Sequence, residues 1–293
     1  MKPRDIAAAT GVAVVWGLAF IAVKVGVQET SPLMLSALRF LLAAFPFVFF
    51  TKPPKAPVFT VVLYGLLIGV GQFGGLFIAI HQGFPVGLAS LIVQAQAFFT
   101  IGLAWAFLGE APQRPQLIGV GVGFLGMALI GSERLAGASL GPFLLVILAS
   151  FFWGAGNVLA KTLGRIDMFA FIVWSSLAAP LPLLALSLAV DGTSPLLALA
   201  HPSLRLVVAA LVVAYAGTIF GFGVWSRLLS HYPAAAVAPF ALLVPIVGMA
   251  AAAIVFHEPL SAVELIGGLL VMAGLALNVF GDWALRRAAA LFR

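Results

Sequence analysis

The sequence contains no cysteine and few charged residues. None of its 293 residues is cysteine and 8% are charged, whereas about a quarter of the residues in a typical soluble domain are charged. The absence of cysteine excludes disulfides, thiol nucleophiles and cysteine-ligated metals. So few charges cannot cover a water-facing surface, and 63% of the residues are hydrophobic. We therefore expect membrane lipid to surround most of this protein.

Signatures of metal binding and enzyme catalysis are also missing. The four histidines (His81, His201, His231 and His257) are scattered and show no metal-ligand spacing. No His-Glu-x-x-His motif, phosphate-binding loop or Ser/His/Asp arrangement appears. The sequence thus predicts no cofactor and disfavours a membrane enzyme. Its net charge of +6 is informative through the positions of the basic residues, and we predict no nucleic-acid partner.

Ten apolar runs are candidates for crossing a bilayer, which takes about 20 residues. The predicted spans cover residues 6–27, 32–50, 58–80, 86–108, 116–130, 141–163, 168–190, 204–229, 234–256 and 262–280. The first run follows Lys2 and Arg4 but is too long for the apolar core of a signal peptide, so we interpret it as a retained span. The connections are mostly short, which makes consecutive helices antiparallel neighbours. The predicted fold is an all-α membrane protein.

Basic residues are unequally divided between the two sides of these spans. One side carries Lys2, Arg4, Lys52, Lys55, Arg114, Arg165, Arg286, Arg287 and Arg293. The other side carries only Arg134 and Arg205. The positive-inside rule places the first side in the cytoplasm. Both termini are therefore predicted to be cytoplasmic, which requires an even number of spans.

Several residues recur in the two halves of the sequence. The recurring sets are Trp16-Gly17, Lys24, Glu110 and residues 117–119 in the first half, and Trp153-Gly154, Lys161, Glu258 and residues 265–267 in the second. The halves, residues 1–134 and 135–293, would each hold five spans. Because five is odd, the second half is inverted relative to the first. Inverted repeats around a central cavity are a recurrent plan in transporters, although some channels share them.

The same motifs resemble the EamA family of the drug/metabolite transporter (DMT) superfamily. The resemblance is carried by Trp16-Gly17-x-x-Phe20-x-x-x-Lys24, by the run Gly109-Glu110…Gly119…Gly126, and by their second-half copies. It implies a carrier with two EamA domains in a bacterial inner membrane, most similar to the YddG-like amino-acid exporters. On this resemblance we expect export of amino acids or similar small metabolites. Another drug or metabolite carrier of the superfamily is the alternative.

Two tryptophans and two lysines are candidates for contact with the substrate. Trp16 and Trp153 lie near the middle of their spans, where an indole face suits apolar or cationic groups. The alternative is packing, in which the adjacent glycine admits a neighbouring helix and the ring fills the gap. Lys24 and Lys161 lie near the ends of their spans. Each either attracts a substrate carboxylate at one gate or extends its amine to the lipid headgroups.

Polar side chains and prolines within the spans complete the candidate site. The polar candidates for substrate binding are Gln72, Gln94, Gln96 and Asn157. Such groups usually face the protein interior or a water-filled path, but each amide can instead bond a neighbouring helix. Pro239 and Pro245 interrupt the ninth span, and a broken helix often borders a substrate site. We predict a hinge or gating role for them, against the alternative of an ordinary membrane-helix proline.

Two further predictions concern a helix start and a charged residue deep in a span. Ser261-x-x-Glu264 has the form of a capping box and predicts the start of the last helix. Arg39, in the second span, is expected to pair with Glu29 or Asp191.

No aspartate or glutamate lies in the middle of any predicted span. Many proton-coupled carriers use a buried carboxylate as the proton site. We therefore predict alternating access without a dedicated proton-binding carboxylate, and export as facilitated flow down a substrate gradient. A monomer is compatible with this plan.

Overall fold

The computed structural model describes residues 1–135, 140–164, 166–232 and 234–291. These residues form helices without strands, and ten helical spans are long and apolar enough to cross a membrane. The spans are Pro3–Glu29, Pro32–Phe49, Val58–His81, Val86–Leu108, Arg114–Glu133, Leu140–Lys161, Met168–Asp191, Leu204–Leu228, Ala238–Phe256 and Ala262–Gly281. The predicted all-α fold with ten spans is thereby confirmed.

Four spans are continuous α-helices. They are α1 (Pro3–Glu29), α7 (Arg114–Leu135), α8 (Leu140–Lys161) and α16 (Ala262–Leu291). At the start of α16, Ser261 Oγ accepts the amide of Glu264 at 3.1 Å, and the Glu264 carboxylate accepts the amide of Ser261 at 3.0 Å. This reciprocal pair is the predicted capping box.

The other six spans are interrupted by 3₁₀ or π segments. In the first half, the second span consists of α2 (Pro32–Ala44) and η1 (Phe47–Phe49), the third of α3 (Val58–Leu66), η2 (Leu67–Gly74) and α4 (Gly75–His81), and the fourth of α5 (Val86–Ile92), η3 (Val93–Ala95) and α6 (Gln96–Leu108). In the second half, the seventh span consists of α9 (Met168–Ser175), η4 (Ser176–Ala178) and α10 (Pro180–Asp191), the eighth of α12 (Leu204–Leu211), η5 (Val212–Phe220) and α13 (Gly221–His231), and the ninth of α14 (Ala234–Val237), η6 (Ala238–Leu242) and α15 (Leu243–Phe256). A short helix that the sequence did not predict, α11 (Ser194–Ala200), lies between the seventh and eighth spans.

The interruptions occur in matching spans of the two halves. The third and eighth spans contain the π segments η2 and η5, and the fourth and ninth contain the 3₁₀ segments η3 and η6. Segments of this kind free backbone groups and often mark functional sites in membrane helices. Three of the candidate site residues, Gln72, Gln94 and Pro239, lie in these segments.

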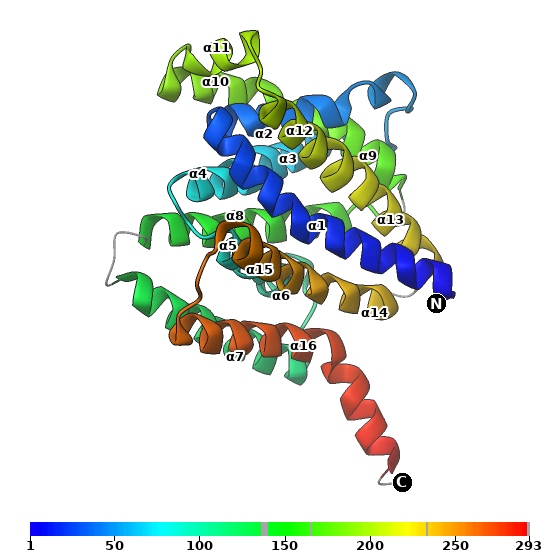
Figure 1. The fold of residues 1–293 in the computed structure, drawn as a ribbon. Coiled ribbons are helices and arrows are strands. Elements are labelled where there is room, and N and C mark those ends of the chain that lie inside the picture. The colour runs from blue at the N-terminus through cyan, green and yellow to red at the C-terminus, as the bar shows by residue number, and fades with distance from the viewer. Residues whose placement is uncertain (136–139, 165, 233, 292–293) are drawn as a thin grey trace.

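Glycines allow close helix crossings away from this region. Helices α7 and α16 lie side by side at the bottom of Figure 1. A Cβ built at Gly126 would lie 2.5 Å from the carbonyl oxygen of Gly267, and one at Gly267 would lie 2.8 Å from that of Gly126. Gly119 and Gly274 face each other in the same way. These repeated glycines therefore serve helix packing.

The first helix of each half packs on the fourth span of the other half. Helix α1 crosses α15, and α8 crosses α6. A Cβ at Gly17 would lie 2.7 Å from Val247 Cβ, and one at Gly154 would lie 2.8 Å from Phe99 Cβ. The glycine of each Trp-Gly pair thus allows a neighbouring helix to approach closely, as the packing alternative predicts.

Both ends of the chain lie on one side of the bundle (Figure 1). We call this side the terminal face; it includes the connections that precede α3, α7 and α9. The side with the connections that precede α2, α5, α12 and α16 is the opposite face. Beneath the opposite face lies a buried apolar cluster that includes Val27, Phe77, Ile80, Phe84 and Leu88. This cluster closes the bundle at that end.

Candidate substrate cavity

A cavity of about 1120 Å³ enters the bundle from the terminal face. Lys161, Gly164 and Asp167, all exposed, lie at its mouth. Its deepest walls include Val23 and Phe77. Among the described residues, none from the connections of the opposite face contributes to the lining. The cavity is therefore blind, and its volume is sufficient for a small metabolite.

Most of the predicted substrate-binding residues lie along this cavity. Seven of the eight line it: Trp16, Gln72, Gln94, Gln96, Trp153, Asn157 and Lys161. Lys24 is not among the lining residues. Whether the seven contact a substrate stays a prediction, but the fold brings them together from four different spans.

The two prolines of the ninth span lie beside the cavity wall. Pro239 is in the 3₁₀ segment η6, and Pro245 is near the start of α15. Their neighbours Ala238, Ala241 and Val244 line the cavity, and the prolines themselves do not. Pro239 thus lies within the interruption of this span and Pro245 shortly after it, and their gating role stays a prediction.

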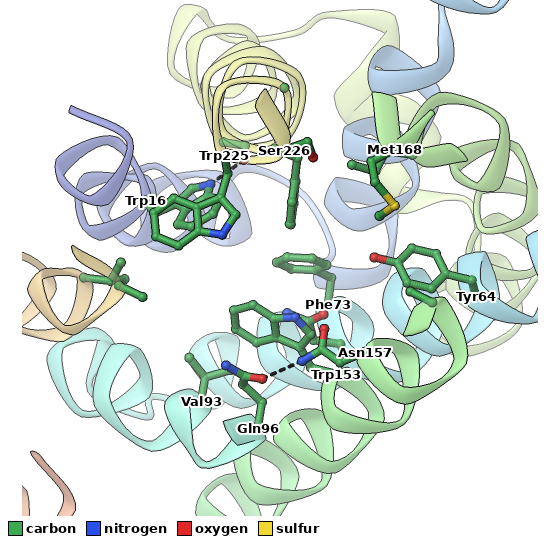
Figure 2. Close-up of a pocket in the computed structure, with 18 of the residues that line it drawn as sticks. Trp16, Tyr64, Phe73, Val93, Gln96, Trp153, Asn157, Met168, Trp225 and Ser226 are labelled. Atoms are coloured by element: carbon green, nitrogen blue, oxygen red, sulfur yellow. Dashed lines mark hydrogen bonds between the residues drawn. The ribbon is translucent and has the colours of Figure 1, made fainter. Parts of the chain in front are cut away.

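Aromatic rings form two facing walls of the cavity (Figure 2). Trp16 and Trp225 lie on one wall, Trp153 lies on the other, and Phe73 lies between them. The Trp16 indole N–H donates to the carbonyl oxygen of Gly217 at 2.8 Å, and its ring centroid is 5.2 Å from that of Trp225. The hydrogen bond fixes the orientation of the indole while its ring remains exposed to the cavity.

Trp225 and Phe73 were not among the predicted site residues. Both are close in sequence to an irregular helix segment: Phe73 lies in η2, and Trp225 lies five residues after η5 ends. Glycines flank Phe73 on both sides, and Gly221 and Gly223 precede Trp225. An aromatic residue within a glycine-rich stretch of a membrane span was the available signal.

The polar candidates differ in their hydrogen bonding. Asn157 Nδ2 donates to Gln96 Oε1 at 2.6 Å and to Thr100 Oγ1 at 3.1 Å, which joins α8 to α6 at the cavity wall (Figure 2). This is the helix–helix bond that the alternative interpretation predicts, made inside the cavity. Gln72 is 2% exposed, and its Oε1 has no hydrogen-bond partner among the described residues. Gln94 is also buried.

Arg39 lies in the cavity wall, and its predicted pairing is wrong. The side chain is 4% exposed, and its guanidinium carbon is 3.6 Å from the centroid of the Phe73 ring. Glu29 lies 3.8 Å from Arg205, and Asp191 accepts a hydrogen bond from Ser187. Both carboxylates are at the opposite face, whereas Arg39 is about two turns into α2 and faces the cavity.

Lys24 is held in an ion pair near the opposite face. Its Nζ is 2.6 Å from Glu258 Oε1 and 4.2 Å from the centroid of the Phe256 ring. The side chains of Lys24 and Glu258 are 25% and 13% exposed. The Glu258 carboxylate also accepts the backbone amides of Val86 at 3.3 Å and Gly87 at 3.2 Å. This carboxylate therefore ties α1 and α5 to the end of α15.

Lys161 makes the corresponding ion pair at the terminal face. It bonds Glu110, and the two side chains are 54% and 46% exposed. In both pairs the lysine comes from the first helix of one half, and the glutamate follows the fourth span of the other half. Neither lysine is an unpaired cation in this conformation, so a direct role in substrate binding stays a prediction for both.

Comparison with known proteins gives a consistent family match. The model of the EamA-like transporter family matches residues 4–132 and again residues 140–280. The chain is 41% identical, over 99% of both chains, to a probable amino-acid metabolite efflux pump of Salmonella typhimurium. It is 40% identical to a protein of the same description from Escherichia coli K12, over 96% of both chains. The predicted family resemblance is confirmed.

More distant relatives share the same extent of chain. An uncharacterised inner membrane transporter of Escherichia coli K12, YedA, is 27% identical over 89% of this chain and 86% of its own. A crystal structure with 14% sequence identity superposes with a TM-score of 0.64 and covers 94% of this chain and 96% of that one. At that identity the superposition supports the fold alone.

Proposed function

The chain belongs to the EamA-like transporter family, and we propose that it exports amino acids or similar small metabolites across a bacterial inner membrane. The observation that carries this proposal is the blind cavity of about 1120 Å³, with aromatic and amide walls and one open end. Two relatives of about 40% identity are described as probable amino-acid metabolite efflux pumps. The cavity offers rings for an apolar side chain and amides for polar groups.

The basic residues orient the proposed transporter. Most of them belong to the terminal face, which the positive-inside rule assigns to the cytoplasm. The cavity then opens to the cytoplasm, and the structure is the inward-open state that receives a substrate for export.

Alternating access follows from the two halves and their ion pairs. Each half contributes a lysine to one pair and a glutamate to the other, at opposite ends of the bundle. In the proposed cycle the Lys24–Glu258 pair opens and the cavity closes at the terminal face around Lys161. Because the two halves are inverted, contacts at the terminal face can form as the equivalent contacts at the opposite face break. The segments η2, η3, η5 and η6, with Pro239 and Pro245, supply the bending.

The proposed export needs no proton-binding carboxylate in the cavity. Asp167 is the one acidic residue among the described lining residues, and its carboxylate caps α9 by accepting the amides of Phe169 and Ala170. A facilitator would move substrate down its own gradient and exchange it in either direction.

Counterflow tests the proposal. Purified protein in liposomes preloaded with unlabelled amino acids should take up labelled phenylalanine, methionine or threonine after all ion gradients are collapsed. Trp153→Ala should lower the exchange rate about tenfold, because one aromatic contact is worth roughly 1.5 kcal/mol. Trp105, which is 56% exposed on the outside of α6, provides the control: Trp105→Ala should leave exchange unchanged.

Three results would count against parts of the proposal. Folded protein that exchanges no amino acid would favour the alternative of another drug or metabolite carrier. Exchange that requires an imposed proton gradient would reject facilitation. Equal losses of exchange rate in Trp105→Ala and Trp153→Ala would show that Trp153 has no specific role in the cavity wall.

A further inference from the structure

Arg39 is a buried cation without a counter-ion in the described part of the chain. It is 4% exposed, and its Nε has no hydrogen-bond partner there. The acidic groups near α2, Glu29 and Asp191, are engaged elsewhere. A charged side chain within a membrane span is costly unless it is paired or faces a water-filled cavity. Arg39 lines the cavity, so its compensating group is expected to come from within the cavity.

The surroundings of Arg39 hold its guanidinium against the cavity wall. The group stacks on Phe73, with 3.6 Å between the guanidinium carbon and the ring centroid, which favours the cation while leaving its edge free to donate. A methyl group added at Gly217 would lie 3.9 Å from Arg39 Nη2. The carbonyl of Gly217 receives the Trp16 indole N–H. Arg39 and Trp16 thus both lie close to Gly217 in η5, and Trp16 is hydrogen-bonded to it.

Gln72 supplies a hydrogen-bond acceptor that complements the donor groups of Arg39. Its Oε1 is a buried acceptor without a partner among the described residues, and it precedes Phe73 in η2. Two residues that line the cavity, Arg39 and Gln72, thus each carry a buried polar atom without a partner among the described residues. Buried polar groups are normally paired, and an unpaired buried set at a cavity is expected to be completed by a ligand.

We propose that Arg39 binds the carboxylate of the transported substrate and that Gln72 Oε1 accepts a hydrogen bond from its ammonium group. The inference rests on the proposed function and specifies which end of an amino acid lies at α2. The substrate side chain then extends along the aromatic walls formed by Trp16, Phe73 and Trp153.

The charge of the cavity favours a carboxylate over a phosphate ester. A dianionic phosphate is normally held by several cations. Three cationic residues of the described chain line the cavity: Arg39, Lys161 and Arg227. Lys161 is neutralised by Glu110, and Arg227 is exposed near the end of α13 at the terminal face. Of the three, Arg39 is the one that lies deep in the cavity, among aromatic rings. A planar guanidinium matches a planar carboxylate in a two-point contact, which suits a monocarboxylate.

Acid–amide pairs test the assignment of Arg39. Binding to the purified protein would be followed through quenching of cavity tryptophan fluorescence, with phenylalanine and methionine compared with their carboxamides. The wild-type protein should prefer the acids about 10- to 100-fold, as expected for hydrogen bonds to a charged group. Arg39→Gln should reduce this preference to about threefold or less while amide binding stays unchanged. Arg39→Lys, which keeps the charge, should retain part of the preference.

Arg205 provides a matched control because it carries the same charge at the opposite face, where it is 80% exposed. Arg205→Gln should keep the wild-type preference. A preference retained in Arg39→Gln would overturn the inference. So would equal weakening of acid and amide together with a lowered melting temperature, because Arg39 would then serve the fold.

A failure of the proposed function can be distinguished from a failure of the role assigned to Arg39. If the wild-type protein binds no amino acid, export of amino acids is rejected. Phenylacetate and phenylacetamide then decide the role of Arg39 alone. A wild-type preference for the acid that Arg39→Gln abolishes would support the carboxylate site, and its persistence in that variant, or its absence from the wild-type protein, would reject it.

Discussion

The two ends of the bundle carry the same residue pair in different surroundings. At the opposite face, Lys24 and Glu258 are 25% and 13% exposed, and the glutamate also holds two backbone amides at the start of α5. At the terminal face, Lys161 and Glu110 are 54% and 46% exposed at the mouth of the cavity. Equivalent sequence motifs thus form a closed end and an open end in one conformation.

This difference shows that the conformation, and not the sequence motif, determines how much each ion pair contributes to stability. An exposed ion pair in water typically stabilises by about 0–1 kcal/mol. Removing one member of a buried pair costs roughly 3–5 kcal/mol, because the other charge is left behind. In the outward-open state that we propose, the two pairs would exchange these environments.

The largest expected effect comes from removing one glutamate at each end. Glu258→Gln should lower the free energy of unfolding by about 3 kcal/mol, since it leaves the Lys24 charge partly buried and weakens the contacts to Val86 and Gly87. Glu110→Gln should cost less than about 1 kcal/mol. Apparent melting temperatures in detergent would measure both. Equal shifts would mean that the two ends have equivalent environments in solution.

The second-largest expected effect is a loss of stability that should be equal in the two halves. Gly17→Ala places a Cβ 2.7 Å from Val247 Cβ and 2.9 Å from the Val244 carbonyl oxygen, and Gly154→Ala places one 2.8 Å from Phe99 Cβ. Each substitution should cost about 2 kcal/mol, because backbone and branched atoms must move apart.

Gly121→Ala is the matched control, because a Cβ there meets nothing within 4 Å. It should leave the melting temperature unchanged or raise it slightly, since alanine favours the helix. A large difference between Gly17→Ala and Gly154→Ala would show that the asymmetry of the two ends extends into the helix crossings.

The sequence predicted the spans well because the membrane imposes a simple rule. About 20 apolar residues must satisfy their own backbone hydrogen bonds, so span number and order are visible in hydropathy. The interruptions η2 and η5 were not predictable, since a π segment depends on contacts with other helices. Helix α11 was missed because it is too short to produce a clear pattern.

The site was predicted in part for a related reason. Polar residues and tryptophans deep in a span are unusual enough to be recognised, and seven of eight candidates line the cavity. Pairing is a three-dimensional property. The crossed partners of Lys24 and Lys161, and the orientation of Arg39 away from Glu29, depend on how two halves of one chain assemble.

The smallest expected effect tests the closed end directly. The chain has no cysteine, so Val23→Cys would be its one thiol. Val23 is 3% exposed and lines the deep wall of the cavity. An impermeant maleimide applied from the opposite face should label it slowly. Adding Glu258→Gln should accelerate labelling about tenfold, because loss of roughly 1.4 kcal/mol from the closed state shifts the population by that factor.

Two controls separate gating from general loosening. Ala160→Cys, at the cavity wall one residue before Lys161, should be labelled rapidly from the terminal face with or without Glu258→Gln. Glu110→Gln should not accelerate labelling of Val23→Cys, because it acts at the end that is already open. If it accelerated labelling as strongly as Glu258→Gln, the two pairs would not be opposing gates. The difference in exposure between them would then be a local feature without a role in the transport cycle.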